Sequence, residues 1–288
     1  MAEPVRSDIH IALTFDFDAY TNWIGSLRAT SPSMISRGEF GPIGVRRILA
    51  LLAQYQAPAT FFIPGAVVVS YPRVAAAILE AGHEIGHHGW LHENPTSLTS
   101  DQELQILERG LDAFRDVLDI RPVGYRSPSW DNSPNTVKLL IEHGFEYESS
   151  LMGSDFEPYW CRIGDKWSMS EPFEFGEPTP LVEMPVAWHL DDWPWFEHIP
   201  GHAQGLQPPS SVLEVWKSEL DYLYRQVGHG VLIITMHPQA IGRGHRLNML
   251  ADFLAYASSL SGVRFSTCIE YVRAWRVDKT PSLPEDVG

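Results

Sequence analysis

Three segments of this chain share one local pattern, a helical run that ends at a glycine and leads directly into a strand. The segments are ILEAGHEIG, LLIEHGFEY and YRQVGHGVLI, and their glycines are Gly82, Gly144 and Gly228. Glycine at this place adopts the left-handed conformation that ends a helix. A chain that alternates helices and strands in this way predicts a parallel sheet, because each helix returns the next strand in the same direction.

Eight short runs rich in β-branched and aromatic residues are the predicted strands. They cover residues 9–15, 59–63, 83–87, 123–126, 145–148, 181–186, 231–236 and 263–265. Between them, Pro72 suits a first helical turn, and Thr99 with Gln102 has the pattern of a capping box. The count predicts an α/β barrel of seven or eight strands, with an open doubly wound sheet as the alternative.

Two long stretches interrupt the alternation, residues 20–42 and 151–180, both rich in Gly, Pro, Ser and aromatic residues. Loops of this length are usually functional, so we expect both to form walls of a pocket. The sequence contains no internal repeat and no linker-like charge run. We therefore predict a single domain over residues 9–275, with an N-terminal extension at 1–8 and a C-terminal tail at 276–288.

The charge and the cysteine content limit the kinds of partner and the cellular compartment that we expect for this protein. Lys and Arg number 21 against 36 Asp and Glu, a formal charge of −15, which repels nucleic acid and anionic membranes. Cys161 and Cys268 lie far apart without a CxxC pattern, as expected for two unreactive thiols. The N-terminus lacks a secretory signal, and no run of about 20 apolar residues is present, so we expect a cytoplasmic protein without a membrane anchor.

Two motifs that follow predicted strands carry candidate metal ligands. Asp16 and Asp18 lie in TFDFD at the end of the first strand, and His88 and His92 lie in HHGWLH after the third. In a helical turn, residues four apart share one face, so the two imidazoles reach a single ion. Two histidines and one carboxylate can hold Zn²⁺, Mn²⁺ or Fe²⁺. His87 is an alternative ligand, but its spacing of five to His92 suits a helical face poorly.

Two further polar residues follow predicted strands. Arg126 in RSPSW is placed to pair with an Asp from a neighbouring strand end, and His237 in MHP ends an apolar run that reads as a buried parallel strand. The C-terminal ends of the strands form the face of an α/β barrel where active sites are built. The candidates therefore converge on one face.

The four motifs TFDFD, HHGWLH, RSPSW and IITMHP, in this order, resemble the polysaccharide deacetylase (NodB-homology) superfamily. The resemblance covers most of the chain and implies a distorted barrel that hydrolyses amide C–N bonds with a divalent metal, Zn²⁺ foremost and Mn²⁺, Co²⁺ or Fe²⁺ as alternatives. It implies that Asp16 is the base and that the metal ligands are Asp18, His88 and His92. Arg126 and His237 correspond to the arginine of the third motif and the late histidine.

One departure from the superfamily pattern bears on the substrate. Phe17 separates the two aspartates, which are adjacent in chitin and peptidoglycan deacetylases. The spaced form looks more like the branch with cyclic imide hydrolases, allantoinase-type amidohydrolases and intracellular peptidoglycan deacetylase homologues. We expect a small cyclic imide or amide as substrate, with N-deacetylation of peptidoglycan or chitin-type glycans as the alternative. By analogy with that branch, we expect a homo-oligomer, a tetramer.

The expected chemistry assigns a role to each remaining residue. Asp16 takes a proton from water, and His237 as imidazolium protonates the leaving nitrogen. Arg126 orients Asp16, while Asp191 or Asp192 is the expected carboxylate partner of His237. Three tryptophans near strand ends, Trp23, Trp130 and Trp188, are expected to bind the flat face of a ring.

Two other functions use some of the same residues. A facial-triad iron oxygenase has the same ligand set, but it requires neither the acid His237 nor the base Asp16. A non-catalytic glycan-binding homologue is disfavoured because the acid, the base and the three ligands are all present.

Overall fold

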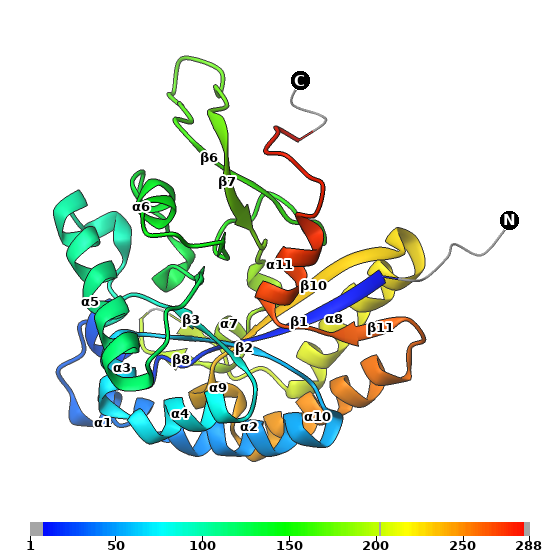
Figure 1. The fold of residues 1–288 in the computed structure, drawn as a ribbon. Helices are drawn as coiled ribbons and strands as arrows, with labels where there is room; N and C mark the ends of the chain where they lie inside the picture. Colours follow the sequence, from blue (N-terminus) through cyan, green and yellow to red (C-terminus); the bar gives the residue numbers. More distant parts are fainter. Residues whose placement is uncertain (1–7, 202, 285–288) are drawn as a thin grey trace, which may run out of the picture.

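The computed structural model describes residues 8–201 and 203–284, which form one curled sheet covered by helices (Figure 1). The strands are β1 (Asp8–Asp16), β2 (Thr60–Ile63), β3 (Glu84–His87), β4 (Gly124–Tyr125), β5 (Tyr147–Glu148), β6 (Tyr159–Ile163), β7 (Glu177–Glu183), β8 (His198–Ile199), β9 (Ala203–Gln204), β10 (His229–Met236) and β11 (Val263–Phe265). In the sheet the order is β10-β1-β2-β3-β4-β5-β7-β6, and β11 also pairs with β1. The predicted parallel α/β sheet is confirmed.

The sheet curls into a half-barrel. Within the described residues, its two sides are joined at a single point. β10 and β7 do not pair as strands, and a single parallel bridge joins Asp191 to Thr235 of β10. The predicted distorted (β/α) barrel is confirmed as a single domain. The open doubly wound alternative is wrong, because this bridge brings the segment after β7 back against β10.

All eight predicted strands are present, with ends that shift by a few residues. The largest shift is at β7, which begins at Glu177 rather than at Leu181. The sequence analysis missed β6 and the short antiparallel pair of β8 and β9. β6 pairs antiparallel with β7, and the two form a hairpin that projects from the barrel (Figure 1).

The helices lie where the predicted periodicity and caps place them. Gly82, Gly144 and Gly228 have φ of +82°, +73° and +84°, the left-handed conformation expected of them. The helices are α1 (Pro32–Ile35), α2 (Gly41–Tyr55), α3 (Gly65–Ser70), α4 (Pro72–Glu80), α5 (Ser100–Leu118), α6 (Thr136–Glu142), α7 (Asp192–Phe196), α8 (Pro209–Tyr222), α9 (Pro238–Ile241), α10 (Gly244–Ser259) and α11 (Cys268–Trp275). Short helical turns of other types are η1 (Asn22–Ser26), η2 (Gly38–Phe40), η3 (Pro95–Ser97), η4 (Pro128–Trp130), η5 (Trp188–Leu190) and η6 (Leu223–Val227).

Local sequence explains several of these helix starts. Pro72 is the first residue of α4, as predicted. Thr99 caps α5, and the reciprocal hydrogen bonds of a capping box with Gln102 are both present. The capping box satisfies backbone N–H groups at the start of α5, whereas Pro72 has no N–H that the first turn of α4 would leave free.

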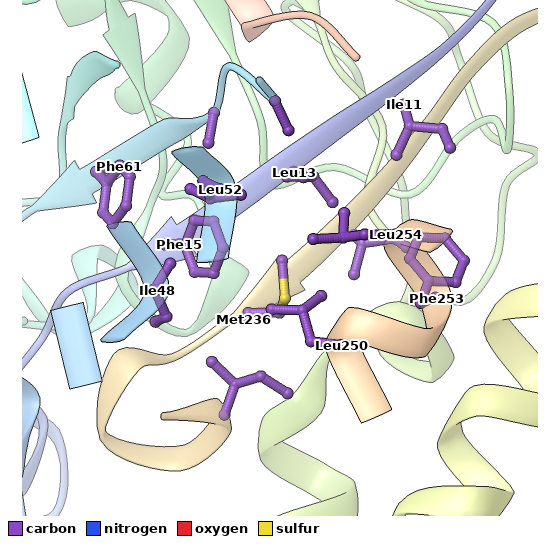
Figure 2. Close-up of a cluster of buried hydrophobic side chains, with 14 of the residues drawn as sticks. Ile11, Leu13, Phe15, Ile48, Leu52, Phe61, Met236, Leu250, Phe253 and Leu254 are labelled. Atoms are coloured by element: carbon purple, nitrogen blue, oxygen red, sulfur yellow. The ribbon is translucent and has the colours of Figure 1, made fainter. Parts of the chain in front are cut away.

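The main core lies between the sheet and the helices α2 and α10 (Figure 2). In β1, Ile11, Leu13 and Phe15 point to this layer and are fully buried. Because side chains alternate across a strand, Thr14 and Asp16 point to the inside of the barrel. The alternation in β1 therefore builds the core on one face and places the first polar residues of the site on the other.

The two long stretches differ from the expected loops. Residues 20–42 fold into η1, α1 and η2 and enter α2, whereas residues 151–180 contain the β6–β7 hairpin. Cys161 and Cys268 are buried free thiols. Within the described residues, no helix is long and apolar enough to cross a membrane. The expected extension at 1–8 lies outside the described residues except for Asp8, and the tail is described as far as residue 284.

Candidate metal and catalytic site

Asp16 lies at the end of β1 with its carboxylate held by a buried arginine. Arg126 Nη1 donates to Asp16 Oδ1 at 2.8 Å and to the hydroxyl of Thr14 at 2.8 Å. The guanidinium is fully buried, and its Nε and Nη2 donate to the backbone oxygen and hydroxyl of Ser149. This geometry fixes the orientation of Asp16. The expected pairing of Arg126 with a strand-end aspartate is present, but it joins β1 and β4, which β2 and β3 separate in the sheet.

Asp18 and two histidines converge two residues further along. Asp18 Oδ1 lies 3.4 Å from Nε2 of His88, and Asp18 Oδ2 lies 3.7 Å from Nε2 of His92. The candidate ligand atoms of the three residues lie within 4.8 Å of one another, and all three side chains are buried. Burial raises the pKa of Asp18, but its interactions with His92, His88 and His237 together outweigh burial and bring it to about 2. Asp18 is therefore a carboxylate at neutral pH.

Hydrogen bonds on the far side of each ring set the tautomers of the two histidines. Nδ1 of His88 lies 2.7 Å from the backbone oxygen of Arg126, so Nδ1 carries the proton and donates. Nδ1 of His92 lies 2.6 Å from Ser26 Oγ, which itself donates to the backbone oxygen of His92. Burial lowers the pKa of His92 to about 4. With the hydrogen on Nδ1, the lone pair of each neutral imidazole tautomer is on Nε2, the nitrogen directed at Asp18.

Unsatisfied atoms show that this donor set fits a divalent metal. Asp18 Oδ1 and His88 Nε2 are buried without a hydrogen-bond partner within the described part of the chain. Two lone pairs buried against each other are costly unless a cation or a proton lies between them. Two imidazole nitrogens and one carboxylate are also the ligand types that zinc and other first-row metals accept in sites with open positions.

The loop that carries the two histidines is not the helical turn that the spacing predicted. Residues 88–92 form no helix, and His92 has φ of +60°, the left-handed region. The helical expectation is wrong because Gly25 of η1 packs against this loop: a Cβ there would lie 1.7 Å from the Leu91 oxygen. This close approach of η1 to the loop brings Ser26 next to His92. The loop, rather than a helical turn, directs the His92 imidazole toward Asp18.

His87, the alternative ligand, lies elsewhere. Its Nε2 is 3.1 Å from the backbone oxygen of Leu107, and its Nδ1 accepts from the Gly89 N–H at 3.1 Å. Burial lowers the pKa of His87 to about 3, so the ring is neutral. Both nitrogens are occupied, and His87 packs between β3 and α5.

His237 follows β10 and is supported by Asp192 rather than by Asp191. Asp192 Oδ1 lies 2.7 Å from Nδ1 of His237 and also accepts the His237 backbone N–H at 3.0 Å. Asp191 Oδ1 is 3.5 Å from the same ring nitrogen, because this carboxylate caps α7 by accepting the Trp193 N–H at 2.8 Å. Of the two candidates, Asp192 is therefore the partner of His237 and Asp191 is not, because the Asp191 carboxylate is the cap of α7.

The charges around His237 favour its protonated form. Burial alone lowers the pKa of His237, but the carboxylates of Asp191 and Asp192 outweigh burial and raise the pKa well above 6.5. Nε2 of His237 lies 3.7 Å from Asp18 Oδ2, so it faces the same space as the two other histidines. Asp191, Asp192 and His237 could themselves group around an ion, but His237 Nδ1 already donates to Asp192 Oδ1 and Asp191 Oδ1 already accepts the Trp193 N–H, which leaves Asp192 Oδ2 buried without a partner in the described residues.

A pocket of about 190 Å³ opens over these groups, and tryptophans form its walls. Trp130 and Trp188 pack together with ring centroids 4.5 Å apart, and Trp188 is 48% exposed at the rim. Trp23 does not line this pocket, which corrects the expectation for it: its side chain is fully buried behind Trp193, which lines the pocket instead. Residues 151–180 do not line it either, so only the stretch 20–42 supplies a wall, through η1 and Leu27.

Three residues of the site were assigned no role from the sequence alone. Ser26 orients His92, Trp193 lines the pocket beside His237, and Gln239 donates to Asp18 Oδ2 at 3.4 Å. Gln239 lies two residues after His237, in a segment that could have been searched for polar side chains. Ser26 carries no sequence signal, since its role depends on a loop that folds against the strand ends, whereas Trp193 is one of the tryptophans that the sequence places in loops or near strand ends.

Comparison with known proteins identifies the family. The polysaccharide deacetylase family model matches residues 5–148, which include the two aspartates, the two histidines and Arg126. A peptidoglycan deacetylase of Helicobacter pylori is 36% identical over 277 residues, covering 91% of this chain and 94% of that protein. The chain belongs to the polysaccharide deacetylase family.

Solved structures place this family member in the same fold. A protein of Mycobacterium smegmatis is 34% identical with a TM-score of 0.84, over 99% of this chain and 97% of that chain. The allantoinase PuuE has a TM-score of 0.77 and 23% identity, over 95% of this chain and 92% of that chain. The second likeness shows the shared fold alone. The polysaccharide deacetylase superfamily expected from the four motifs is confirmed.

Proposed function

We propose that this member of the polysaccharide deacetylase family is a divalent-metal-dependent hydrolase that cleaves an amide C–N bond in a compact ring substrate. One observation carries the proposal: Nε2 of His88, Nε2 of His92 and both oxygens of Asp18 converge, with two of these atoms lacking any partner in the described chain. Zn²⁺ is the proposed ion, with Mn²⁺, Co²⁺ and Fe²⁺ as alternatives. Such an ion polarises the substrate carbonyl and activates a water molecule.

The side chains around this position supply the proton transfers. Asp16, held by Arg126 on Oδ1, keeps Oδ2 free to take a proton from the attacking water. His237, protonated and held on Nδ1 by Asp192, donates its Nε2 proton to the leaving nitrogen. An iron oxygenase needs neither group, and a glycan-binding protein needs no metal ligands. Both alternatives therefore leave these residues unexplained.

We propose a small cyclic imide or amide as substrate because of the pocket's size and walls. A cavity of about 190 Å³ between Trp130, Trp188 and Leu27 suits one flat ring rather than an extended chain. Both long stretches were expected to form walls of the pocket, but only residues 20–42 line it. The proposal therefore rests on the size of the pocket and on its aromatic walls.

N-deacetylation of a peptidoglycan glycan is the second candidate. The relative that is 36% identical, over 91% of this chain, is a peptidoglycan deacetylase. The N-acetylated sugar would enter past the half-exposed ring of Trp188. Aromatic faces bind sugar rings as readily as imides.

A hydrolysis panel tests both substrates on metal-loaded protein. The panel contains cyclic imides, ureides, chitin oligomers and peptidoglycan fragments, assayed by ring opening or by acetate release. We expect turnover of a cyclic imide or small amide with little acetate from glycans. Acetate release from glycans with imides untouched would reverse the substrate order, and turnover that survives full metal removal would reject the metal-dependent mechanism.

We also propose self-association through the β6–β7 hairpin. Large apolar side chains on it are exposed, namely Ile163 at 42%, Trp167 at 69%, Phe173 at 47% and Phe175 at 44%. A contiguous apolar surface of this kind is typical of an interface. Light scattering should give the mass of an oligomer, a tetramer by analogy with the related branch, and Trp167→Ser should lower it. A monomer at micromolar concentration would reject the proposal. The cytoplasmic location stays a prediction.

A further inference from the structure

A second cavity, of about 150 Å³, lies behind Trp23 and shares no lining residue with the tryptophan pocket. We call it the arginine pocket, because its walls contain Arg37, Arg243 and Arg246. Glu197 is its one carboxylate. On a chain with a formal charge of −15, a cavity with three guanidinium groups and one carboxylate is an unusual concentration of positive charge.

Each guanidinium of the arginine pocket is held flat against an aromatic ring. Arg37 lies 4.4 Å from the ring centroid of Trp23, Arg243 lies 3.6 Å from that of Phe40, and Arg246 lies 4.5 Å from that of Phe196. A guanidinium stacked on a ring keeps its N–H edge available, and this planar fork matches the oxygens of a phosphate or carboxylate. The pocket therefore has ordered donors rather than mobile surface arginines.

The existing partners leave donors unused. Arg37 pairs with Glu197 and donates to the backbone oxygen of His198, and Arg246 donates to two backbone oxygens. Arg246 Nε and Trp23 Nε1 are nevertheless buried without a partner in the described residues, and their side chains are 7% and 0% exposed. Buried donors without partners are costly, so a ligand that accepts hydrogen bonds is favoured here.

The positive charges are also incompletely compensated. Burial lowers the pKa of Arg246, and the attraction of Asp192 and Glu197, which exceeds the repulsion from Arg243 and Arg37, does not fully offset burial. Asp192 is already hydrogen-bonded to His237, and Glu197 to Arg37. An anion in the pocket would supply the missing charge.

One buried acceptor selects among anions. Gln239 lines the pocket, is 4% exposed, and its Oε1 has no partner in the described residues, while its Nε2 points to Asp18 Oδ2 at 3.4 Å. Hydrogen phosphate carries an O–H that can donate to this oxygen, whereas sulfate and acetate have no proton to give near neutral pH. The single acceptor beside several donors thus favours a protonated oxyanion.

We propose that the arginine pocket binds a phosphate group in its hydrogen phosphate form. The phosphate oxygens accept from Arg243, Arg246 Nε and Trp23 Nε1, and the phosphate hydroxyl donates to Gln239 Oε1. The same contact fixes the Gln239 amide with its N–H toward Asp18, so the pocket and the proposed metal site share one side chain. The phosphate comes either as the free ion or as a monoester in its singly charged form, since only that form of a monoester keeps one O–H.

Titration calorimetry on the metal-loaded full chain at constant ionic strength tests binding. We expect inorganic phosphate to bind at least about 10-fold more tightly than sulfate or acetate, the usual size of a charge-assisted hydrogen bond. Arg243→Ala, at an exposed residue, should weaken the phosphate site about 10-fold or more. Arg47→Ala is the matched control, since Arg47 is exposed and lies 5.5 Å from the same Phe40 ring but outside the pocket.

Glycerol 3-phosphate, compared with inorganic phosphate at about pH 6 where a monoester still keeps part of its P–OH, distinguishes the two sources: affinity equal to that of phosphate indicates a monoester, and no binding indicates the free ion. Arsenate, which keeps the acidic hydroxyl, then locates the site by anomalous diffraction from soaked crystals, with a peak expected between Arg243 and Arg246. A peak only at the metal site, or none, overturns the proposal. Equal affinity for sulfate, or equal losses in Arg243→Ala and Arg47→Ala, overturns it as well.

Discussion

Ser26 Oγ lies 2.6 Å from Nδ1 of His92 and donates its own proton to the backbone oxygen of His92 at 2.8 Å. The hydroxyl has one proton, so toward the ring it can only accept. Nδ1 of His92 must therefore carry a hydrogen, and Nε2 keeps the lone pair that faces Asp18. A serine from η1 thus sets the chemical state of a candidate metal ligand 66 residues away in the chain.

Replacing this serine should weaken metal binding without removing a ligand. Ser26→Ala leaves His92 free to turn or to change tautomer, and loss of such an orienting contact typically costs about 10–100-fold in metal affinity. Competition with a chelating dye measures the affinity. Ser36→Ala is the control, because Ser36 is exposed and bonds only within its own helical turn. Equal affinities of Ser26→Ala and wild type would contradict the role.

Removing the ligands should abolish metal binding. We expect about one divalent ion per chain in the wild type and little in His88→Ala or in the Asp18→Ala, His88→Ala double variant, because the single variant loses one of the three ligands and the double variant loses two. Elemental analysis after dialysis measures the content. His245→Ala, at an exposed histidine, should keep its metal. A full equivalent of metal in the double variant would contradict the assignment of this metal site.

Asp16→Asn should separate catalysis from metal binding. The amide can still accept from Arg126 but cannot take a proton, so we expect metal content to persist while kcat falls about 10²–10⁴-fold. Asp252→Asn, at an exposed aspartate, controls for the change in charge. The hydrolysis panel and elemental analysis give both readouts. Turnover near that of the wild type would reject Asp16 as the base.

The two neighbouring aspartates should differ in what they support. Asp192→Asn removes the charge that holds Nδ1 of His237, so we expect kcat to fall about 10²-fold. Asp191→Ala removes the cap of α7, so we expect a loss of about 1 kcal/mol in the free energy of unfolding and a smaller loss of kcat. Urea titrations and steady-state rates distinguish them. A larger kcat loss in Asp191→Ala would reverse the corrected assignment.

A buried pair of carboxyls predicts a pH dependence of stability. Glu148 and Glu183 are fully buried and both accept the Ser150 N–H, at 3.1 Å and 3.0 Å. Burial, followed by the charge of Glu148, raises the pKa of Glu183 well above 4.5. The folded protein therefore binds more protons than the unfolded chain above pH 4.5, and this pair costs stability as pH rises toward the raised pKa.

Glu183→Gln should remove this cost, because an amide imitates the protonated acid and can still accept from Ser150 and Leu151. We expect the variant to gain stability over the wild type as pH rises, by up to about 1.4 kcal/mol per pH unit within that window. Urea unfolding at pH 5, 6 and 7 measures the difference. Glu177→Gln, exposed on the same strand, should show no such trend. A constant difference across pH would contradict the raised pKa.

Local sequence determined much of the fold, because the signals involved are local. Gly82, Gly144 and Gly228 end helices since a left-handed residue is needed there, and this requirement depends only on neighbouring backbone. Alternation along β1 likewise placed Asp16 on the barrel side of the strand. Motif order along the chain was enough to identify the superfamily.

The tertiary structure decided the chemical role of individual side chains in the site, because these roles depend on contacts between segments that are distant in the sequence. The spacing of His88 and His92 predicted a helix, yet the packing of Gly25 on the Leu91 oxygen produced a loop that brings both rings to Asp18. Asp191 and Asp192 are indistinguishable in the sequence, and only the start of α7 assigns one to the cap and the other to His237. Trp23 was expected to bind the flat face of a ring, but its side chain is buried because η1 folds inward against Trp193.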